Sequence, residues 1–110
     1  IQVGRGLSLL RDVNVGNRLK RGAWRVLFVD QSCPRCQDLL AAYFRPRSNG
    51  SPRLLSEGGT AVIETRRAEH PIDNHGNTSI VIGRLSQSSA LSIRVPLEIE
   101  LMDGVVVATR

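Results

Sequence analysis

The feature that most constrains this chain is a pair of cysteines, two residues apart, that directly follows an apolar segment. Val26 to Val29 are four consecutive apolar residues, a pattern typical of a central strand buried on both faces. After Cys36, apolar residues recur with the spacing of an amphipathic helix, until Pro46 ends the pattern. The sequence therefore predicts a strand over 24–30 and a helix over 33–44. The apolar helix positions after Cys36 are Leu39, Leu40, Tyr43 and Phe44.

The spacing of Cys33 and Cys36 has a chemical meaning at the start of a helix. Residues three apart lie on one helix face, roughly 5–6 Å from each other, which is within reach of a disulfide. The first thiol meets unpaired backbone N–H groups and the positive end of the helix dipole, so its pKa is expected to fall from about 8.5 into the range of about 3.5–7.5. Arg35 is expected to act in the same direction through its charge. The motif thus predicts a redox dithiol in which Cys33 attacks and Cys36 resolves the mixed disulfide.

Composition argues against nucleic-acid binding and against a membrane-spanning segment. The 110 residues fit a single domain, and the net charge of +5 would permit nucleic-acid binding. However, the basic residues are scattered and lack the interleaved aromatic residues that stack bases, so we expect a solvated basic surface and no nucleic-acid partner. No apolar run approaches the about eighteen residues of a membrane span. Since the chain begins at Ile1 rather than Met, an export signal, a tether or a larger parent protein is compatible with the sequence.

The end of the chain carries a second clear pattern. Apolar and acidic residues alternate over 97–101, and Asp103-Gly104 then leads into an apolar run over 105–108. Asp-Gly suits the positive φ angles of a tight hairpin turn, so a β-hairpin is predicted, with Pro96 at the start of its first strand.

The remaining segments give weaker patterns. The segment 60–65 is β-branched and follows a helix, so it is predicted to pair parallel to 24–30. In chain order we further expect an irregular lead-in over 1–23 with a short strand or helical turn near 7–10, a loop over 45–59, a polar turn-rich segment over 66–78, a strand over 79–82 and a short helix over 85–93.

Taken together, residues 24–44 and 95–108 resemble the thioredoxin superfamily. The shared pattern is a strand, Cys-Pro-Arg-Cys on a helix, and Val-Pro leading into an antiparallel hairpin with Asp-Gly at its tip. The resemblance implies one α/β domain over 1–110, with a central mixed β-sheet flanked by helices. The superfamily's C-terminal helix is expected to be absent, because the chain stops at Arg110 directly after the hairpin. The sheet face thereby left bare is expected to carry Glu98 and Glu100.

The resemblance also nominates site residues. It implies that Pro96 is cis and lies against the sulfurs, and that Val95 offers backbone hydrogen bonds to a bound peptide. Pro34 and Arg35 join the site as the residues between the two cysteines. The segment from Leu27 to Cys36 looks closest to extracytoplasmic bacterial members, including those related to methylamine-utilisation and cytochrome-maturation proteins, which favours a periplasmic location.

The chain departs from the common thioredoxin pattern at several positions, one of which is Pro34-Arg35 in place of the Gly-Pro of thioredoxin itself. Ser32 stands where a Trp usually precedes the first cysteine, and Ala41 where a proline kinks the helix. Leu27 occupies the position of a buried acid that many thioredoxins carry, so that proton relay is not expected here.

Three readings of the dithiol remain open at this point. The preferred one is thiol-disulfide exchange with a protein partner through Cys33 and Cys36, without organic cofactor or metal. A second is a thioredoxin-like binding module without turnover. A third is a zinc site completed by His70 and His75, although residues 37–69 separate the thiols from the first imidazole, whereas about 12–15 residues do so in common zinc fingers.

Overall fold

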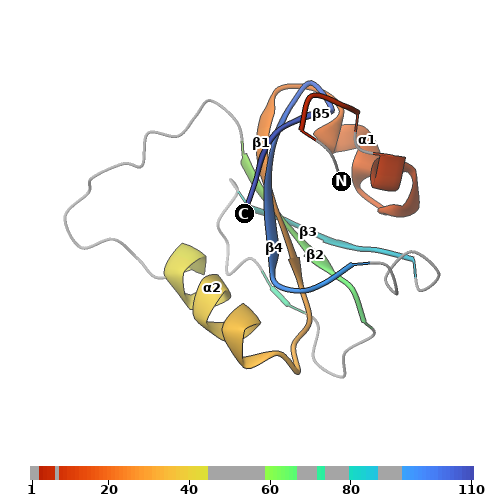
Figure 1. Ribbon diagram of the computed structural model, residues 1–110. Helices are drawn as coiled ribbons and strands as arrows, with labels where there is room; N and C mark the ends of the chain where they lie inside the picture. Colours follow the sequence, from red (N-terminus) through yellow and green to blue (C-terminus); the bar gives the residue numbers. More distant parts are fainter. Residues whose placement is uncertain (1–2, 7, 45–58, 67–71, 74–79, 87–92) are drawn as a thin grey trace.

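The computed structural model describes residues 3–6, 8–44, 59–66, 72–73, 80–86 and 93–110. In this part the chain forms a five-stranded mixed sheet with one longer helix on one face and two short helices on the other (Figure 1). The elements are the 3-10 helix η1 (Ser8–Asp12), α1 (Gly16–Leu19), β1 (Ala23–Val29), α2 (Pro34–Phe44), β2 (Gly59–Glu64), β3 (Ile80–Arg84), β4 (Leu97–Met102) and β5 (Val105–Thr109). The predicted α/β class with a mixed sheet is confirmed at this level.

The strand order is β3-β2-β1-β4-β5, which makes β1 the central strand. β1 pairs with β2 in parallel orientation, as predicted for 24–30 and 60–65. On its other side, β1 pairs with β4 in antiparallel orientation. β3 extends the parallel side of the sheet next to β2. The carboxyl ends of β1, β2 and β3 therefore meet at one edge, and the two cysteines follow β1 at that edge.

β1 buries both of its faces, in agreement with its unbroken apolar run. Val26 and Phe28 point into a cluster on one face, whereas Leu27 and Val29 point into a cluster on the other. All four side chains have no exposed surface. The cluster beneath α2, here called the α2 core, consists of Leu27, Val29, Cys36, Leu40, Val62 and Ile80.

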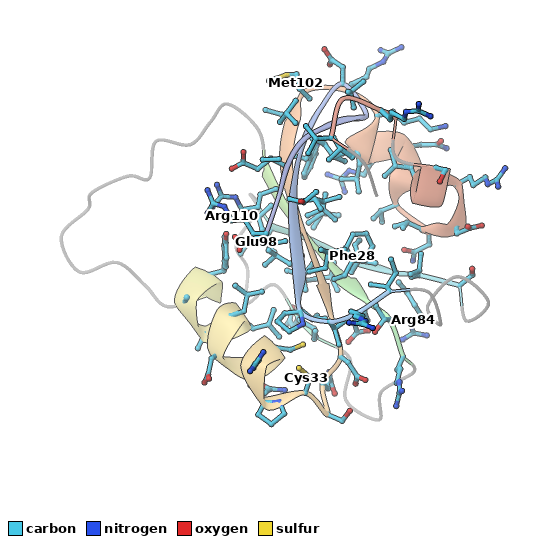
Figure 2. All side chains as sticks on the ribbon, in the orientation of Figure 1. Phe28, Cys33, Arg84, Glu98, Met102 and Arg110 are labelled. Carbon is cyan, nitrogen blue, oxygen red and sulfur yellow. The ribbon has the colours of Figure 1, made fainter. Side chains whose placement is uncertain are left out.

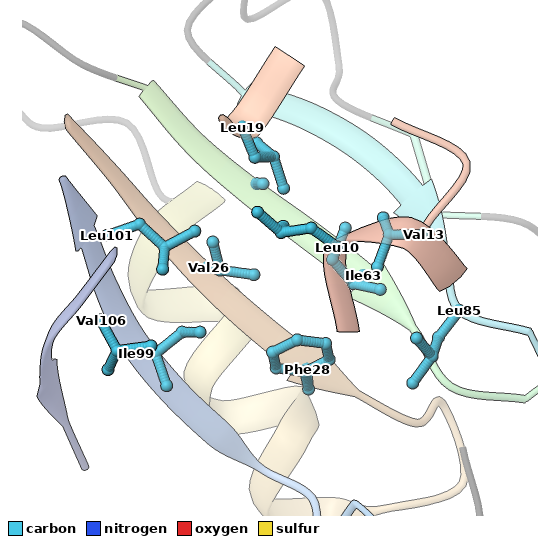
Figure 3. Close-up of a cluster of buried hydrophobic side chains, with 11 residues drawn as sticks. Leu10, Val13, Leu19, Val26, Phe28, Ile63, Leu85, Ile99, Leu101 and Val106 are labelled. Atoms are coloured by element: carbon cyan, nitrogen blue, oxygen red, sulfur yellow. The ribbon is translucent and has the colours of Figure 1, made fainter. Parts of the chain in front are cut away.

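The cluster on the opposite face is covered by the short N-terminal helices (Figure 3). Leu10, Val13 and Leu19 lie over Val26 and Phe28 and are themselves buried. The lead-in over 1–23 was expected to be irregular, but the structure makes its described part a layer of the core. The helical turn expected near 7–10 corresponds to η1.

A glycine makes this layer possible. A Cβ atom at Gly16 would lie 1.8 Å from the carbonyl oxygen of Leu10, so no larger residue fits where α1 meets η1.

The terminal hairpin forms as predicted. Asp103 and Gly104 have φ angles of 51° and 82° and connect β4 to β5. The Asp103 carboxylate accepts a hydrogen bond from the backbone N–H of Gly22 over 2.8 Å, and the Asp103 N–H donates to the Gly22 carbonyl over 3.0 Å. The turn is thereby tied to the start of β1.

Other predicted segments are seen in part. The strand expected over 79–82 runs from Ile80 to Arg84. The helix expected over 85–93 is not seen at its described ends, since Leu85 forms a β-bridge with Val13 and Ile93 is not helical; residues 87–92 lie outside the described residues. Most of the loop expected over 45–59 and most of the polar, turn-rich segment expected over 66–78 also lie outside the described residues, and Gly59 begins β2. Within the described ranges, no helix combines the length and the apolar character that crossing a membrane requires.

Candidate dithiol site

The turn between β1 and α2 positions both cysteines. Cys33 precedes the first helical residue, Pro34, whose fixed φ suits that position and whose missing N–H would have no helical partner there. The backbone N–H of Cys33 donates to the Asp30 carbonyl over 3.0 Å, and the Cys33 carbonyl accepts the first helical hydrogen bond from Gln37 over 3.2 Å. Cys33 is therefore the N-cap residue of α2, where Figure 2 shows its side chain.

The two thiols have different surroundings. Cys33 is half-buried, whereas Cys36 is fully buried in the α2 core. The Cys36 N–H donates to Cys33 Sγ over 3.3 Å, and the Asp30 N–H donates to Cys36 Sγ over 3.5 Å. Both cysteines are free thiols in the structure.

These surroundings separate the pKa values of the thiols. The hydrogen bond from the Cys36 thiol lowers the pKa of Cys33, and the backbone N–H groups of Cys36 and Arg35 act in the same direction. Burial raises the pKa of Cys36 to about 11, and its hydrogen bond to Cys33 adds to that rise. Cys33 is therefore the thiol with the lower pKa. Arg35 contributes through its backbone, while its side chain is exposed.

The residues nominated beside the cysteines are placed as follows. Pro34 and Arg35 are exposed in the first turn of α2. Val95 packs against the α2 core, as does Cys33, so the segment before β4 and the dithiol share one apolar cluster. The Val95–Pro96 peptide bond is cis, as the resemblance implied, and Pro96 is half-buried.

The zinc hypothesis rests on residues outside the described part, since His70 and His75 both lie there. Among the residues that the structure does describe, no group of three or more His, Cys, Asp or Glu side chains could hold a metal ion.

Two acidic residues at this edge were not singled out from the sequence. Asp30 follows β1 and pairs with Arg66, with 3.2 Å between Oδ2 and Nε. Glu64 ends β2, is buried, and accepts hydrogen bonds from Gln31 Nε2 over 3.3 Å and from a backbone N–H over 3.1 Å. Its other oxygen lies 3.6 Å from Arg84 Nη2. Both acids stand at the ends of predicted parallel strands, which is the signal that could have found them.

The far end of α2 is held by a separate polar cluster. Tyr43 donates a hydrogen bond to Glu98 and accepts one from Arg25 Nη1 over 2.9 Å. Arg25 also pairs with Glu100, with 2.6 Å between Nη2 and Oε1. Glu98 and Glu100, expected on a bare sheet face, are thus half-buried partners of Arg25 beside α2. Burial raises the pKa of the Tyr43 hydroxyl, and the hydrogen bond to Glu98 adds to the rise.

The described part of the chain is an α/β domain. Two thiols that differ in burial and pKa follow its central strand, at the start of α2. Neither a protein-family model nor a curated protein sequence matches the chain.

Proposed function

We propose that this chain is a thioredoxin-like thiol-disulfide oxidoreductase that exchanges electrons with protein thiols and disulfides through Cys33 and Cys36. The observation that carries the proposal is the asymmetry of the two thiols. Cys33 is partly accessible with a stabilised thiolate, and Cys36 is buried and protonated one helical turn away. A nucleophile and a resolving group need these two environments, whereas a structural disulfide needs no such difference.

The reaction follows from this arrangement. The Cys33 thiolate attacks one sulfur of a partner disulfide, whose S–S bond breaks, and the other partner sulfur leaves as a thiolate that takes up a proton. Cys36 then loses its proton and attacks Cys33 Sγ, which forms the internal disulfide and releases the second partner thiol. Two electrons pass from the chain to the partner; Cys36 gives up one proton, and the second proton comes from solvent because Cys33 reacts as the thiolate. The reverse sequence oxidises a partner dithiol, so the reduction potential decides the direction.

The position of the motif supports the thioredoxin-like assignment. The cysteines follow the central strand of a mixed sheet, and the next two strands run parallel to it, while a hairpin completes the other side. The chemistry uses the two thiols alone, so no organic cofactor or metal is part of the proposal.

Equilibration with glutathione tests the function. We expect the reduced protein to react with glutathione disulfide and to reach one two-electron equilibrium between about −120 and −270 mV, the range of known exchange proteins. The fraction oxidised can be measured by acid quenching, alkylation and mass spectrometry. Cys33→Ser should abolish the equilibrium.

Two results would contradict the proposal: failure to react with glutathione disulfide, or a potential below about −300 mV, where structural disulfides lie. A Cys33–Cys36 disulfide that glutathione reduces, but whose dithiol form does not reduce a protein disulfide such as that of insulin, would favour the binding module without turnover.

A further inference from the structure

Asp30 contacts both cysteines through its backbone. Its N–H donates to Cys36 Sγ over 3.5 Å, and its carbonyl oxygen accepts a hydrogen bond from the Cys33 N–H over 3.0 Å. The residue thus joins the end of β1 to both halves of the dithiol. The Asp30 side chain is a carboxylate and carries a negative charge.

The Asp30 carboxylate is largely withdrawn from solvent, with 12% of the side chain exposed. Oδ1 accepts hydrogen bonds from the Ser32 N–H and from the Ser32 hydroxyl, both over 3.0 Å. Oδ2 lies 3.2 Å from Arg66 Nε, and 74% of the Arg66 side chain is exposed. The residue whose backbone contacts both cysteines therefore carries a sheltered negative charge, and its counter-charge comes from an exposed arginine after β2.

We propose that Asp30 and Arg66 together set the reactivity of Cys33: the Asp30 carboxylate disfavours the Cys33 thiolate, and Arg66 offsets this repulsion. The inference rests on the proposed exchange function and names two residues that tune it. Asp30 is a positioning residue for the dithiol, because it acts through the charge state of Cys33 and does not react itself.

Electrostatics gives the sign of each effect. A carboxylate opposes a second negative charge nearby, so the charge of Asp30 acts to raise the pKa of both thiols, although the Asp30 backbone N–H acts to lower the pKa of Cys36. The reduced site carries a thiolate charge and the disulfide does not, so Asp30 favours the disulfide. By neutralising Asp30, Arg66 favours the reduced thiolate form.

Other charged groups at this edge have different partners or positions. The Glu64 carboxylate is held by Gln31 and Arg84, and Arg35 is exposed on α2. Asp38, also exposed on α2, offers a matched control because Asp38→Asn removes the same charge without changing the turn between β1 and α2.

The test compares Asp30→Asn, Arg66→Gln, the double variant and Asp38→Asn in the reduced protein. The asparagine keeps an oxygen acceptor for Ser32, so the turn is retained while the charge is lost. The rate of Cys33 alkylation is measured against pH by mass spectrometry, and the equilibrium with glutathione is measured in parallel.

We expect Asp30→Asn to move the midpoint of the Cys33 profile to lower pH and to shift the glutathione equilibrium toward the reduced protein. Arg66→Gln should move both in the opposite direction, lowering the ratio of thiolate to thiol about 1.5- to 5-fold, the range of an exposed ion pair. The effect of Arg66→Gln should largely disappear in the Asp30→Asn background, because the ion pair with Asp30 holds the exposed Arg66 side chain at this edge. Asp38→Asn should shift the midpoint less than Asp30→Asn.

An unchanged or raised midpoint in Asp30→Asn would overturn the role of Asp30. An equal effect of Arg66→Gln in both backgrounds would overturn the pairing. If Asp30→Asn does not fold, Arg66→Gln alone decides, because an exposed side chain can be replaced without opening the core: an unshifted profile then rejects the proposal. Failure of exchange function would appear separately, as absence of any reaction with glutathione disulfide in the parent.

Discussion

Cys33 Sγ accepts a hydrogen bond from the backbone N–H of Cys36 over 3.3 Å. The contact follows from helix geometry, since residues three apart at a helix start lie on the same face and the N–H groups of the first turn have no helical acceptor. It places the negative charge of the dithiol on the outer, reachable sulfur. Cys36, which supplies the N–H, keeps its own thiol buried and protonated.

This relationship predicts the pH dependence of alkylation. Because the pKa of Cys33 is lowered and that of Cys36 is raised to about 11, Cys33 becomes a thiolate first as the pH rises. At pH 7, brief treatment of the reduced protein with iodoacetamide should label Cys33 at least about tenfold faster than Cys36. Peptide mapping by mass spectrometry gives the ratio. Equal labelling, or faster labelling of Cys36, would show that the assignment is reversed.

The role of Arg35 can be divided between its backbone and its charge. The Arg35 backbone N–H helps to lower the pKa of Cys33, while the side chain is exposed, where solvent and salt screen its charge. Arg35→Gln keeps the N–H, so the midpoint of the Cys33 alkylation profile should rise by no more than a few tenths of a pH unit. A rise of a full unit would contradict this and would show that the guanidinium charge acts strongly on Cys33.

The sequence allowed the central strand, α2 and the hairpin to be predicted, because each has a strong local pattern. An unbroken apolar run, a helical apolar spacing and Asp103-Gly104 all act over a few neighbouring residues. Cys33 and Cys36 were found for the same reason.

The N-terminal layer and the charged partners of the site could not be predicted, because they depend on contacts between segments distant in the sequence. The lead-in has few local signals, and its short helices are held by packing of Leu10 and Leu19 over the sheet. The partnership of Asp30 with Arg66 exists only because β1 and β2 end at the same edge. Such pairs depend on the strand order, which local residue patterns do not predict.

Packing of α2 on the sheet should control access to Cys36. Leu40 is buried in the α2 core together with Cys36, so Leu40→Ala should lower the free energy of unfolding by about 2–5 kcal/mol. Local opening of the helix should also speed alkylation of Cys36. Denaturant unfolding and mass spectrometry measure the two effects. Asp38→Ala, an exposed change on the same helix, is the control, and an equal loss of stability there would contradict the packing argument.

The hairpin turn should tolerate asparagine at position 103 but not alanine. Asp103 has a positive φ and its carboxylate accepts the Gly22 N–H, and asparagine can satisfy both requirements. Asp103→Ala should cost about 1–2 kcal/mol of stability, and Asp103→Asn less than about 0.5 kcal/mol. Thermal and denaturant unfolding of the two variants decide this. Equal costs would mean that neither the acceptor nor the backbone conformation matters.

Trapping the mixed disulfide tests the proposed exchange most directly. The reduced Cys36→Ser variant is mixed with a peptide disulfide, quenched with acid and analysed by intact mass and peptide mapping. We predict one peptide thiol bound to Cys33, whereas the parent forms an internal Cys33–Cys36 disulfide and releases both peptide thiols. A Cys36→Ser protein that forms no adduct, or a parent that retains the peptide, would contradict the assignment of Cys33 as nucleophile and Cys36 as resolving thiol.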